Sequence, residues 1–206
     1  MINININKNS NQSGRSMIEM LGVLAIVGVL SVGGIAGYSK AMEMFKINKT
    51  AEQVSQIVTN IRTLYAQQTT YDGLNTTTAI QMGAIPDGIG SGSTITNAFS
   101  GQMSIHSNSS LVNQGAFAIN SGQLTKNACI TLATMDWGTI SSSGLIAIAI
   151  GEMSDSIVGS ANNCTSGYQG RAYVQCSKDG PLNVSLAATH CVCSNEYNCK
   201  IMWKFQ

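Results

Sequence analysis

The longest pattern in the chain is an apolar run from Met17 to Tyr38 that follows a polar stretch, residues 1–14. At about 1.5 Å per residue, a helix over this run would be about 33 Å long, which is enough to cross a hydrocarbon core of ~30 Å. The run is longer than the apolar part of an ordinary secretory signal, and it lacks a clear small-x-small cleavage site; Ala36-Gly37-Tyr38 is the nearest candidate. It therefore predicts a membrane helix.

Charged residues return from Lys40 onwards, yet apolar residues continue to recur at helical spacing. The recurring positions are Phe45, Ile47, Val54, Ile57, Val58, Ile61, Leu64 and Tyr65. Such a stripe is typical of an amphipathic helix. The steps do not form a sustained heptad, so a coiled coil is less favoured. We predict one helix from about Ser16 to about Gln68, roughly 80 Å long, whose second half carries a globular domain.

The remainder of the chain predicts a mixed domain. Residues 69–115 carry turn signals with little periodicity and are interpreted as a long connection. Strands are predicted at residues 116–119, 145–150, 171–176 and 200–205, and short helices at residues 127–135 and from Ser185, as its cap, to about Cys191. The predicted fold is α+β, with a long N-terminal helical spine and a C-terminal head built on an antiparallel sheet.

Composition limits the possible functions. The formal net charge is +1, charged residues make up 10% of the chain, and lysines and arginines do not cluster. Nucleic acid is therefore excluded as the main partner. The common catalytic and phosphate-binding motifs are missing, and the spacing of Asp136, Glu152 and Asp155 does not require an acid–base pair. We expect neither enzymatic activity nor a cofactor.

All six cysteines lie after residue 128: Cys129, Cys164, Cys176, Cys191, Cys193 and Cys199. An even number of cysteines in an exported chain favours disulfides, whereas the same cluster in the cytosol would suggest metal or redox chemistry. Zinc binding by His190, Cys191, Cys193 and Cys199 is an alternative, but the paired C-x2-C spacing of zinc sites is missing. We expect disulfides and no metal.

Glu19 is the one charged residue inside the apolar run. An ionised side chain in lipid is costly, so it is a functional-site hypothesis by default. One interpretation is an intrahelical pair with Arg15, four residues earlier, at the membrane surface. Such a pair contributes only about 0.2–0.5 kcal/mol.

A second interpretation rests on the segment Gly14-Arg15-Ser16-Met17-Ile18-Glu19-Met20-Leu21, which resembles the processing site of type IV prepilins. In that family a polar leader ends in Gly, and Glu is the fifth residue after the cut. The resemblance implies that a prepilin peptidase cuts between Gly14 and Arg15 and methylates the new amino terminus. Arg15 departs from the family pattern, which has Phe, Met or Leu at this position.

The same resemblance implies a life cycle. The precursor would sit in the bacterial inner membrane, meet the pilus assembly machinery there, and polymerise through its N-terminal helix into an extracellular filament that serves adhesion or aggregation. Glu19 would meet the free amine of a neighbouring subunit and set the register. The small residues Gly22, Ala25, Gly28 and Gly33 would let helices approach closely, although a membrane anchor also tolerates them.

Residues in the C-terminal part resemble the major subunits of the type IVb branch. They are Ala128 to Ala133, Asp136-Trp137-Gly138, Ser185-Leu186-Ala187 and Trp203. By this resemblance Cys129 pairs with Cys191, and the remaining pairs are Cys164 with Cys176 and Cys193 with Cys199. Six cysteines allow 15 connectivities, and Cys191 and Cys193 can exchange roles.

The expected organisation is a leader (1–14), a transmembrane or filament-core segment (15–38), an amphipathic segment (39–68) and a disulfide-stapled head (69–206). Two other functions share parts of this argument. A minor pilin or a type II secretion pseudopilin has the same N-terminal features, and a membrane-tethered adhesin or enzyme would keep its N-terminus uncut.

Overall fold

The computed structural model describes residues 17–107, 115–138, 140–152, 164–169, 171–193 and 198–206. Gly14 and Arg15, the predicted leader, and Asp155 lie outside these residues. The chain divides into two compact units between Met42 and Glu43. The larger unit, Glu43–Gln206, contains the sheet and the C-terminal part of the long helix.

Helix α1 spans Met17–Leu64, close to the predicted start and about one turn short of the predicted end at Gln68. After Leu64 the backbone continues in turns, with the amide of Gln68 bonded to the carbonyl of Tyr65 at 2.8 Å. The ring of Tyr65 packs against the ring of Tyr71, with centroids 5.3 Å apart. The stretch between these two tyrosines therefore turns back towards the domain instead of extending the helix.

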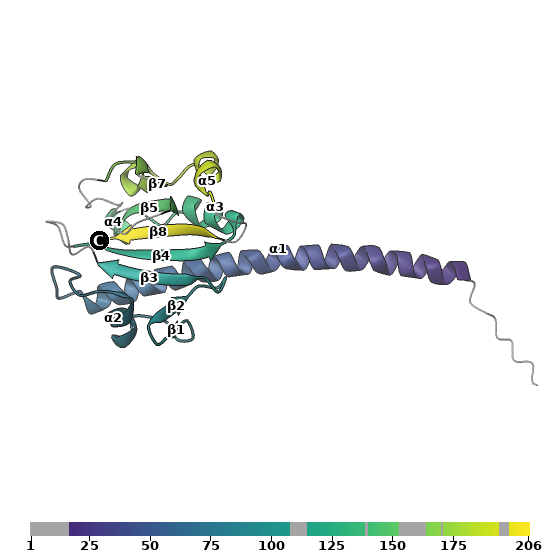
Figure 1. The fold of residues 1–206 in the computed structure, drawn as a ribbon, viewed down its shortest axis with the longest axis horizontal. Helices are drawn as coiled ribbons and strands as arrows, with labels where there is room; N and C mark the ends of the chain where they lie inside the picture. The colour runs from purple at the N-terminus through teal and green to yellow at the C-terminus, as the bar shows by residue number, and fades with distance from the viewer. Residues whose placement is uncertain (1–16, 108–114, 139, 153–163, 170, 194–197) are drawn as a thin grey trace, which may run out of the picture. The chain divides into compact units, whose positions relative to one another are not determined.

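The described part of the head contains one sheet of eight strands in the order β1-β2-β3-β4-β8-β5-β7-β6, and every neighbouring pair is antiparallel (Figure 1). The last strand in sequence, β8, lies in the middle of the sheet between β4 and β5. The strand bounds are β1 Gly90–Ser91, β2 Thr94–Thr96, β3 Gln102–Ser107, β4 Phe117–Leu124, β5 Leu145–Glu152, β6 Gly167–Gln169, β7 Arg171–Cys176 and β8 Cys199–Phe205.

Helices cover one face of this sheet. The part of α1 that belongs to the head passes behind β3 and β4 in Figure 1, while α3 (Lys126–Thr134) and α5 (Val184–His190) lie beside β5 and β8. Short helices α2 (Thr76–Gln81) and α4 (Ile140–Ser143) and a 3-10 turn at Ser177–Asp179 complete the head. The main core combines residues of α1, α3 and the sheet, with Trp203 and Phe117 as its largest buried side chains.

The opposite face of the sheet has a smaller core of mainly short side chains. It includes Ala118, Ala147, Ala149 and Met202. Lys204 of β8 is also buried, and burial lowers the pKa of its ammonium group to about 8. Because strands β4, β5 and β8 are buried on both faces, they form the centre of the domain.

The interpretation of residues 69–115 as a long connection is wrong. This stretch holds α2, β1, β2 and β3, and the side chains of Met103 and Ile105 in β3 enter the core. The strand alternates apolar and polar residues, which is the pattern of a half-buried strand. Asn75 caps α2, since its side chain accepts a hydrogen bond from the amide of Thr78.

Three smaller predictions need correction. Phe45 and Leu64 fall on the apolar stripe that the sequence predicts for α1, but they are 62% and 45% exposed. Thr50 and Gln53 take the buried positions instead. The cap of α5 is Asn183 and not Ser185, whose amide donates to the Asn183 side chain.

The fold class is confirmed: the protein is α+β, with a long N-terminal helix and a C-terminal antiparallel sheet. Strand 145–150 and the final strand appear close to their predicted positions. Strand β6 was not predicted, because three residues at a sheet edge carry too short a pattern.

Candidate functional site

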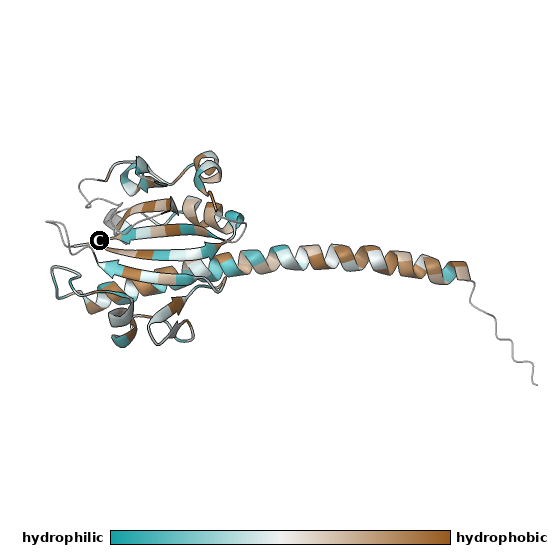
Figure 2. Cartoon of the chain, in the orientation of Figure 1, coloured by the Kyte–Doolittle hydropathy of each residue, from teal (hydrophilic) through white to brown (hydrophobic). Residues whose placement is uncertain are grey.

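The helical segment from Met17 to Met42 exposes almost every apolar side chain that it carries, and Figure 2 shows an extended hydrophobic stretch along this part of α1. The exposed residues are Met17, Ile18, Met20, Leu21, Val23, Leu24, Ile26, Val27, Val29, Leu30, Val32, Ile35 and Tyr38. Among the described residues, α1 is the one helix long and apolar enough to cross a membrane. A surface of this kind needs lipid or other protein around it.

Glu19 lies in the first turn of α1, between exposed apolar neighbours. A carboxylate in a first helical turn interacts favourably with the helix dipole, which supports the helix start but does not neutralise a whole charge. Within the described part of the chain, no hydrogen bond or ion pair reaches Glu19. Its predicted intrahelical partner, Arg15, lies outside that part, so the alternative of an i,i+4 pair stays a prediction.

Among the residues that the structure describes, the glycines of this segment have no packing neighbour. A Cβ atom placed on Gly22, Gly28 or Gly33 would meet no other atom within 4 Å apart from the backbone of the helix itself. Glycine in a helix interior costs roughly 0.5–1 kcal/mol relative to alanine. Since a single subunit gains nothing from them, close approach by another helix is the explanation that the geometry favours.

The helix is fastened to the head by polar contacts that its sequence pattern did not reveal. The carboxylate of Glu43 accepts a 2.7 Å hydrogen bond from the hydroxyl of Thr125, and the Arg62 guanidinium donates to the carbonyl of Ser143 at 2.8 Å. The amide of Asn60 donates to the carbonyl of Ala84 at 3.0 Å. These contacts join the part of α1 within the head to the start of α3, to α4 and to the loop after α2.

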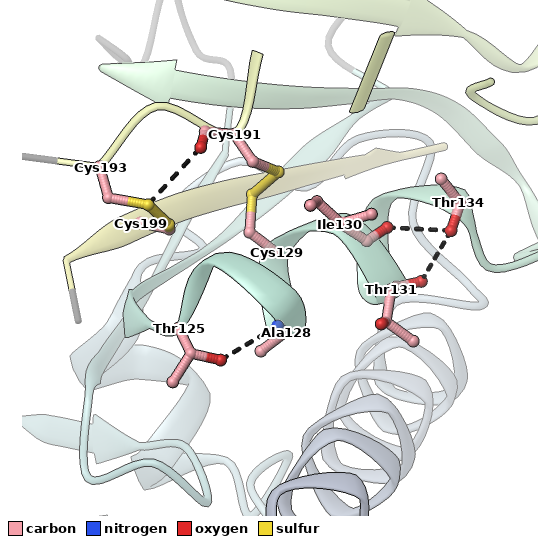
Figure 3. Close-up of a disulfide and its surroundings, with 9 residues drawn as sticks. All are labelled: Thr125, Ala128, Cys129, Ile130, Thr131, Thr134, Cys191, Cys193 and Cys199. Carbon is pink, nitrogen blue, oxygen red and sulfur yellow. Dashed lines mark hydrogen bonds between the residues drawn. A yellow bond between two sulfur atoms is a disulfide. The ribbon is translucent and has the colours of Figure 1, made fainter. Parts of the chain in front are cut away.

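Thr125 joins two elements. Its hydroxyl oxygen accepts a hydrogen bond from the amide of Ala128 and so caps α3, as Figure 3 shows. The same hydroxyl donates a hydrogen bond to the carboxylate of Glu43. A capping residue with β-region backbone angles is what starts a helix at Lys126. The N-terminus of α3 is therefore tied to α1.

The six cysteines lie in three disulfides, Cys129–Cys191, Cys164–Cys176 and Cys193–Cys199. The first joins α3 to the residue after α5, and Figure 3 shows it above the N-terminal turn of α3. Cys193 lies close by, and its sulfur is 3.6 Å from the carbonyl oxygen of Cys191. The pairing itself stays a prediction.

The surroundings of His190 do not favour the zinc alternative. Its Nδ1 atom is 2.8 Å from the hydroxyl of Tyr168, and its ring stacks on Tyr173 with centroids 4.4 Å apart. Cys191, Cys193 and Cys199 have their sulfurs in disulfides. The described residues contain no group of three side chains that could hold a metal ion.

Comparisons with known proteins agree on one family. A family model described as "PilS N terminal" matches residues 44–203. The major structural subunit of bundle-forming pilus from Escherichia coli O127:H6 is 30% identical over 182 residues, which is 87% of this chain and 88% of that protein. The toxin coregulated pilin of Vibrio cholerae is 30% identical over 133 residues, 62% of this chain and 59% of that protein.

Among solved structures, that of TcpA, a type IV pilin from Vibrio cholerae El Tor, has a TM-score of 0.49 and 18% identity and covers 78% of this chain and 99% of that one. The family consists of structural pilins, so an enzymatic function is set aside. The resemblance seen in the sequence is confirmed at the level of the family. The chain belongs to the PilS family of pilins.

Proposed function

We propose that this chain is a structural subunit of a type IVb pilus. The segment Met17–Tyr38 holds it in the bacterial inner membrane as a precursor, and the subunit then polymerises through the same segment into an extracellular filament. The observation that carries this proposal is the exposed apolar helix with one carboxylate in its first turn. Relatives named as major pilus subunits support it.

Processing removes the leader before assembly. A prepilin peptidase in the membrane cuts between Gly14 and Arg15, so that a new amine stands four residues before Glu19. The amine is methylated in the same step. The sequence motif around Gly14 supports this step. Because Arg15 stands where the family has an apolar residue, recognition of the cleavage site depends mainly on Gly14.

Glu19 gains its partner in the filament. The free amine of a neighbouring subunit neutralises the carboxylate inside the apolar bundle. Correct register satisfies both charges, whereas a slipped register leaves a buried charge unpaired, at a cost of about 3–5 kcal/mol. The glycines without intrachain contacts let the helices approach closely enough for this pairing.

The partners follow from this cycle. Copies of the same chain form the filament, and the inner-membrane pilus assembly machinery extracts each subunit from lipid. The relative from Escherichia coli is named for a bundle-forming pilus. From this similarity we infer that filaments of this chain also serve adhesion or aggregation.

Replacement of Glu19 by Ala tests the proposal. The variant is expected to be cut and to stay in the membrane at the normal level, while filaments sheared from the cells fall at least tenfold. Ser31→Ala is the matched control, since Ser31 lies on the same exposed segment and, among the described residues, its hydroxyl donates to the carbonyl of Val27 at 2.7 Å and to no other group. Normal piliation by Glu19→Ala refutes the pairing.

The same sheared material decides the subunit's place in the filament. A major subunit is the dominant protein of that fraction when it is quantified by mass spectrometry. A trace amount would instead assign the chain to the minor pilins or pseudopilins.

A further inference from the structure

The part of α1 that lies within the head, Glu43–Leu64, has two sides of different character. One side is buried against the sheet through Ile47, Val54, Ile57 and Ile61, among others. The other side is exposed and mainly polar: Asn48, Lys49, Glu52, Ser55, Gln56, Thr59 and Thr63, with Leu64, 45% exposed, as the apolar exception at the end of the helix. Phe45 interrupts this polarity, because it is 62% exposed although it is among the largest apolar side chains of the unit.

Phe45 has an apolar neighbour, and the charged side chains near it have contacts within the chain. Met44 beside it is also exposed. Each of the four charged side chains from Glu43 to Glu52 already has a partner within the chain. Glu43 accepts from Thr125, Lys46 lies 5.7 Å from the ring centroid of Phe99, and Lys49 pairs with Glu52 at 3.0 Å.

This compensation matters for docking. An apolar partner placed over Phe45 would cover charges that already have a contact within the chain, which lowers the cost of removing water from them. Further along the helix, the exposed hydroxyl and amide groups would each lose water against an apolar partner. The surface favours contact at Met44 and Phe45 and disfavours it from Asn48 onwards.

We infer that Phe45, with Met44, is the last apolar contact that α1 makes with another copy of this chain, and that the exposed side of α1 from Asn48 onwards stays in contact with water in the filament. The inference rests on the proposed function, whose apolar segment it continues. Phe45 follows Tyr38 by two helical turns in sequence, a spacing that keeps side chains on one side of a helix.

Lipid is the other possible cover for Phe45, and the length of the apolar segment argues against it. A helix from Met17 to Tyr38 is about 33 Å long and by itself fills a hydrocarbon core of ~30 Å. Phe45 begins about 10 Å further along, after Lys40 and Glu43. A second protein helix is the apolar surface available at that level.

Thiol labelling tests the inference. Every native cysteine is in a disulfide, so a single introduced cysteine reacts alone with a maleimide under non-reducing conditions. Phe45→Cys is compared with Ser55→Cys, an exposed position on the polar side of the same helix. Labelling of Phe45→Cys is expected to be at least tenfold slower in sheared filaments than in detergent-solubilised subunits, while Ser55→Cys changes less than threefold.

The outcomes separate the alternatives. Equal labelling of Phe45→Cys in filaments and in solubilised subunits overturns the inference, as does strong protection of Ser55→Cys. Protection of Phe45→Cys in unassembled subunits still in the membrane assigns the cover to lipid and also overturns it. If the unmodified chain forms no filaments, the proposed function fails instead.

A second pair of variants covers the case in which Phe45→Cys does not assemble. Filaments of Phe45→Leu are expected to dissociate at the same detergent concentration as filaments of the unmodified chain. Filaments of Phe45→Ser are expected to dissociate at half that concentration or less. The urea midpoint of the solubilised subunit stays unchanged in both, because Phe45 is mostly exposed there. If Phe45→Ser instead lowered the urea midpoint of the solubilised subunit as much as it weakened the filaments, Phe45 would stabilise the subunit itself. That result would contradict the inference.

Discussion

Thr125 shows how one side chain can tie two helices together. Its hydroxyl caps α3 and also donates to Glu43 on α1. We predict that Thr125→Ala lowers the free energy of unfolding by about 1–2 kcal/mol, the usual cost of losing a cap. Thr125→Ser keeps both bonds and stays within about 0.5 kcal/mol of the unmodified chain.

Urea denaturation of the full chain in detergent measures these changes. Glu43→Ala leaves the cap in place and removes only the second hydrogen bond, so its effect is smaller, about 1 kcal/mol. Equal stability of Thr125→Ala and the unmodified chain would contradict this assignment.

Lys204 gives the head a pH dependence. Burial lowers its pKa to about 8, below its ordinary value of 10.5. Between these two values the unfolded chain binds more protons, so the stability rises as the pH increases from about 8. Above pH 10 the buried Tyr65 opposes the rise, since burial, aided by the charge of Asp72, raises the pKa of its phenol.

We therefore predict that the urea midpoint of the subunit increases between pH 8 and pH 10. Lys204→Met is expected to remove the increase. Lys200→Met, which alters an exposed lysine of the same strand, is expected to keep it. A urea midpoint that does not change between pH 8 and pH 10 in the unmodified chain would show that folding does not lower the pKa of Lys204.

Single residues also mark the limit of what the sequence predicts. Glu19 was identified because a carboxylate in an apolar run is conspicuous on its own. Phe45 was misplaced because periodicity identifies apolar residues that fit a stripe and does not show which of them the head covers. Thr125 gave no signal, since its partner Glu43 lies 82 positions away.

At the scale of elements, the disulfide Cys129–Cys191 connects α3 with the end of α5 across 62 positions. In the chain-entropy model, closing a loop of this length stabilises the fold by about 4 kcal/mol. We predict that the double variant Cys129→Ala, Cys191→Ala loses most of this stabilisation and is degraded before assembly. Non-reducing peptide mapping of the unmodified chain checks the pairing first.

Replacing Cys193 and Cys199 serves as the comparison. This pair closes a loop of 6 positions, for which the same model gives a smaller stabilisation, about 2 kcal/mol. A greater loss from this short loop than from the long one would contradict the assigned roles.

Long elements were predictable and the sheet order was not. Helix α1 and strands β5 and β8 carry strong local patterns, and their positions follow from sequence. Strand β3 also alternates apolar and polar residues, but the turn signals around it led to its interpretation as part of a loop. The insertion of β8 between β4 and β5 depends on pairing between distant segments, for which local periodicity carries no information.

At the scale of the whole molecule, the two compact units have different requirements. The residues from Glu43 onwards bury their own core and use disulfides and hydrogen bonds within the chain. The helical residues before Glu43 expose their apolar side chains and leave Glu19 without a described partner. Such a chain is complete only with lipid around that segment or with other copies of itself.

Both the register between subunits and the neutralisation of Glu19 depend on the free N-terminal amine of a neighbouring subunit. That amine exists only after the leader is removed. The most direct test is the intact mass of subunits taken from sheared filaments, with sequencing of their first residues. The account predicts a subunit that begins at Arg15 and carries one additional methyl group at its amine. A subunit that begins at Met1 within assembled filaments would contradict it.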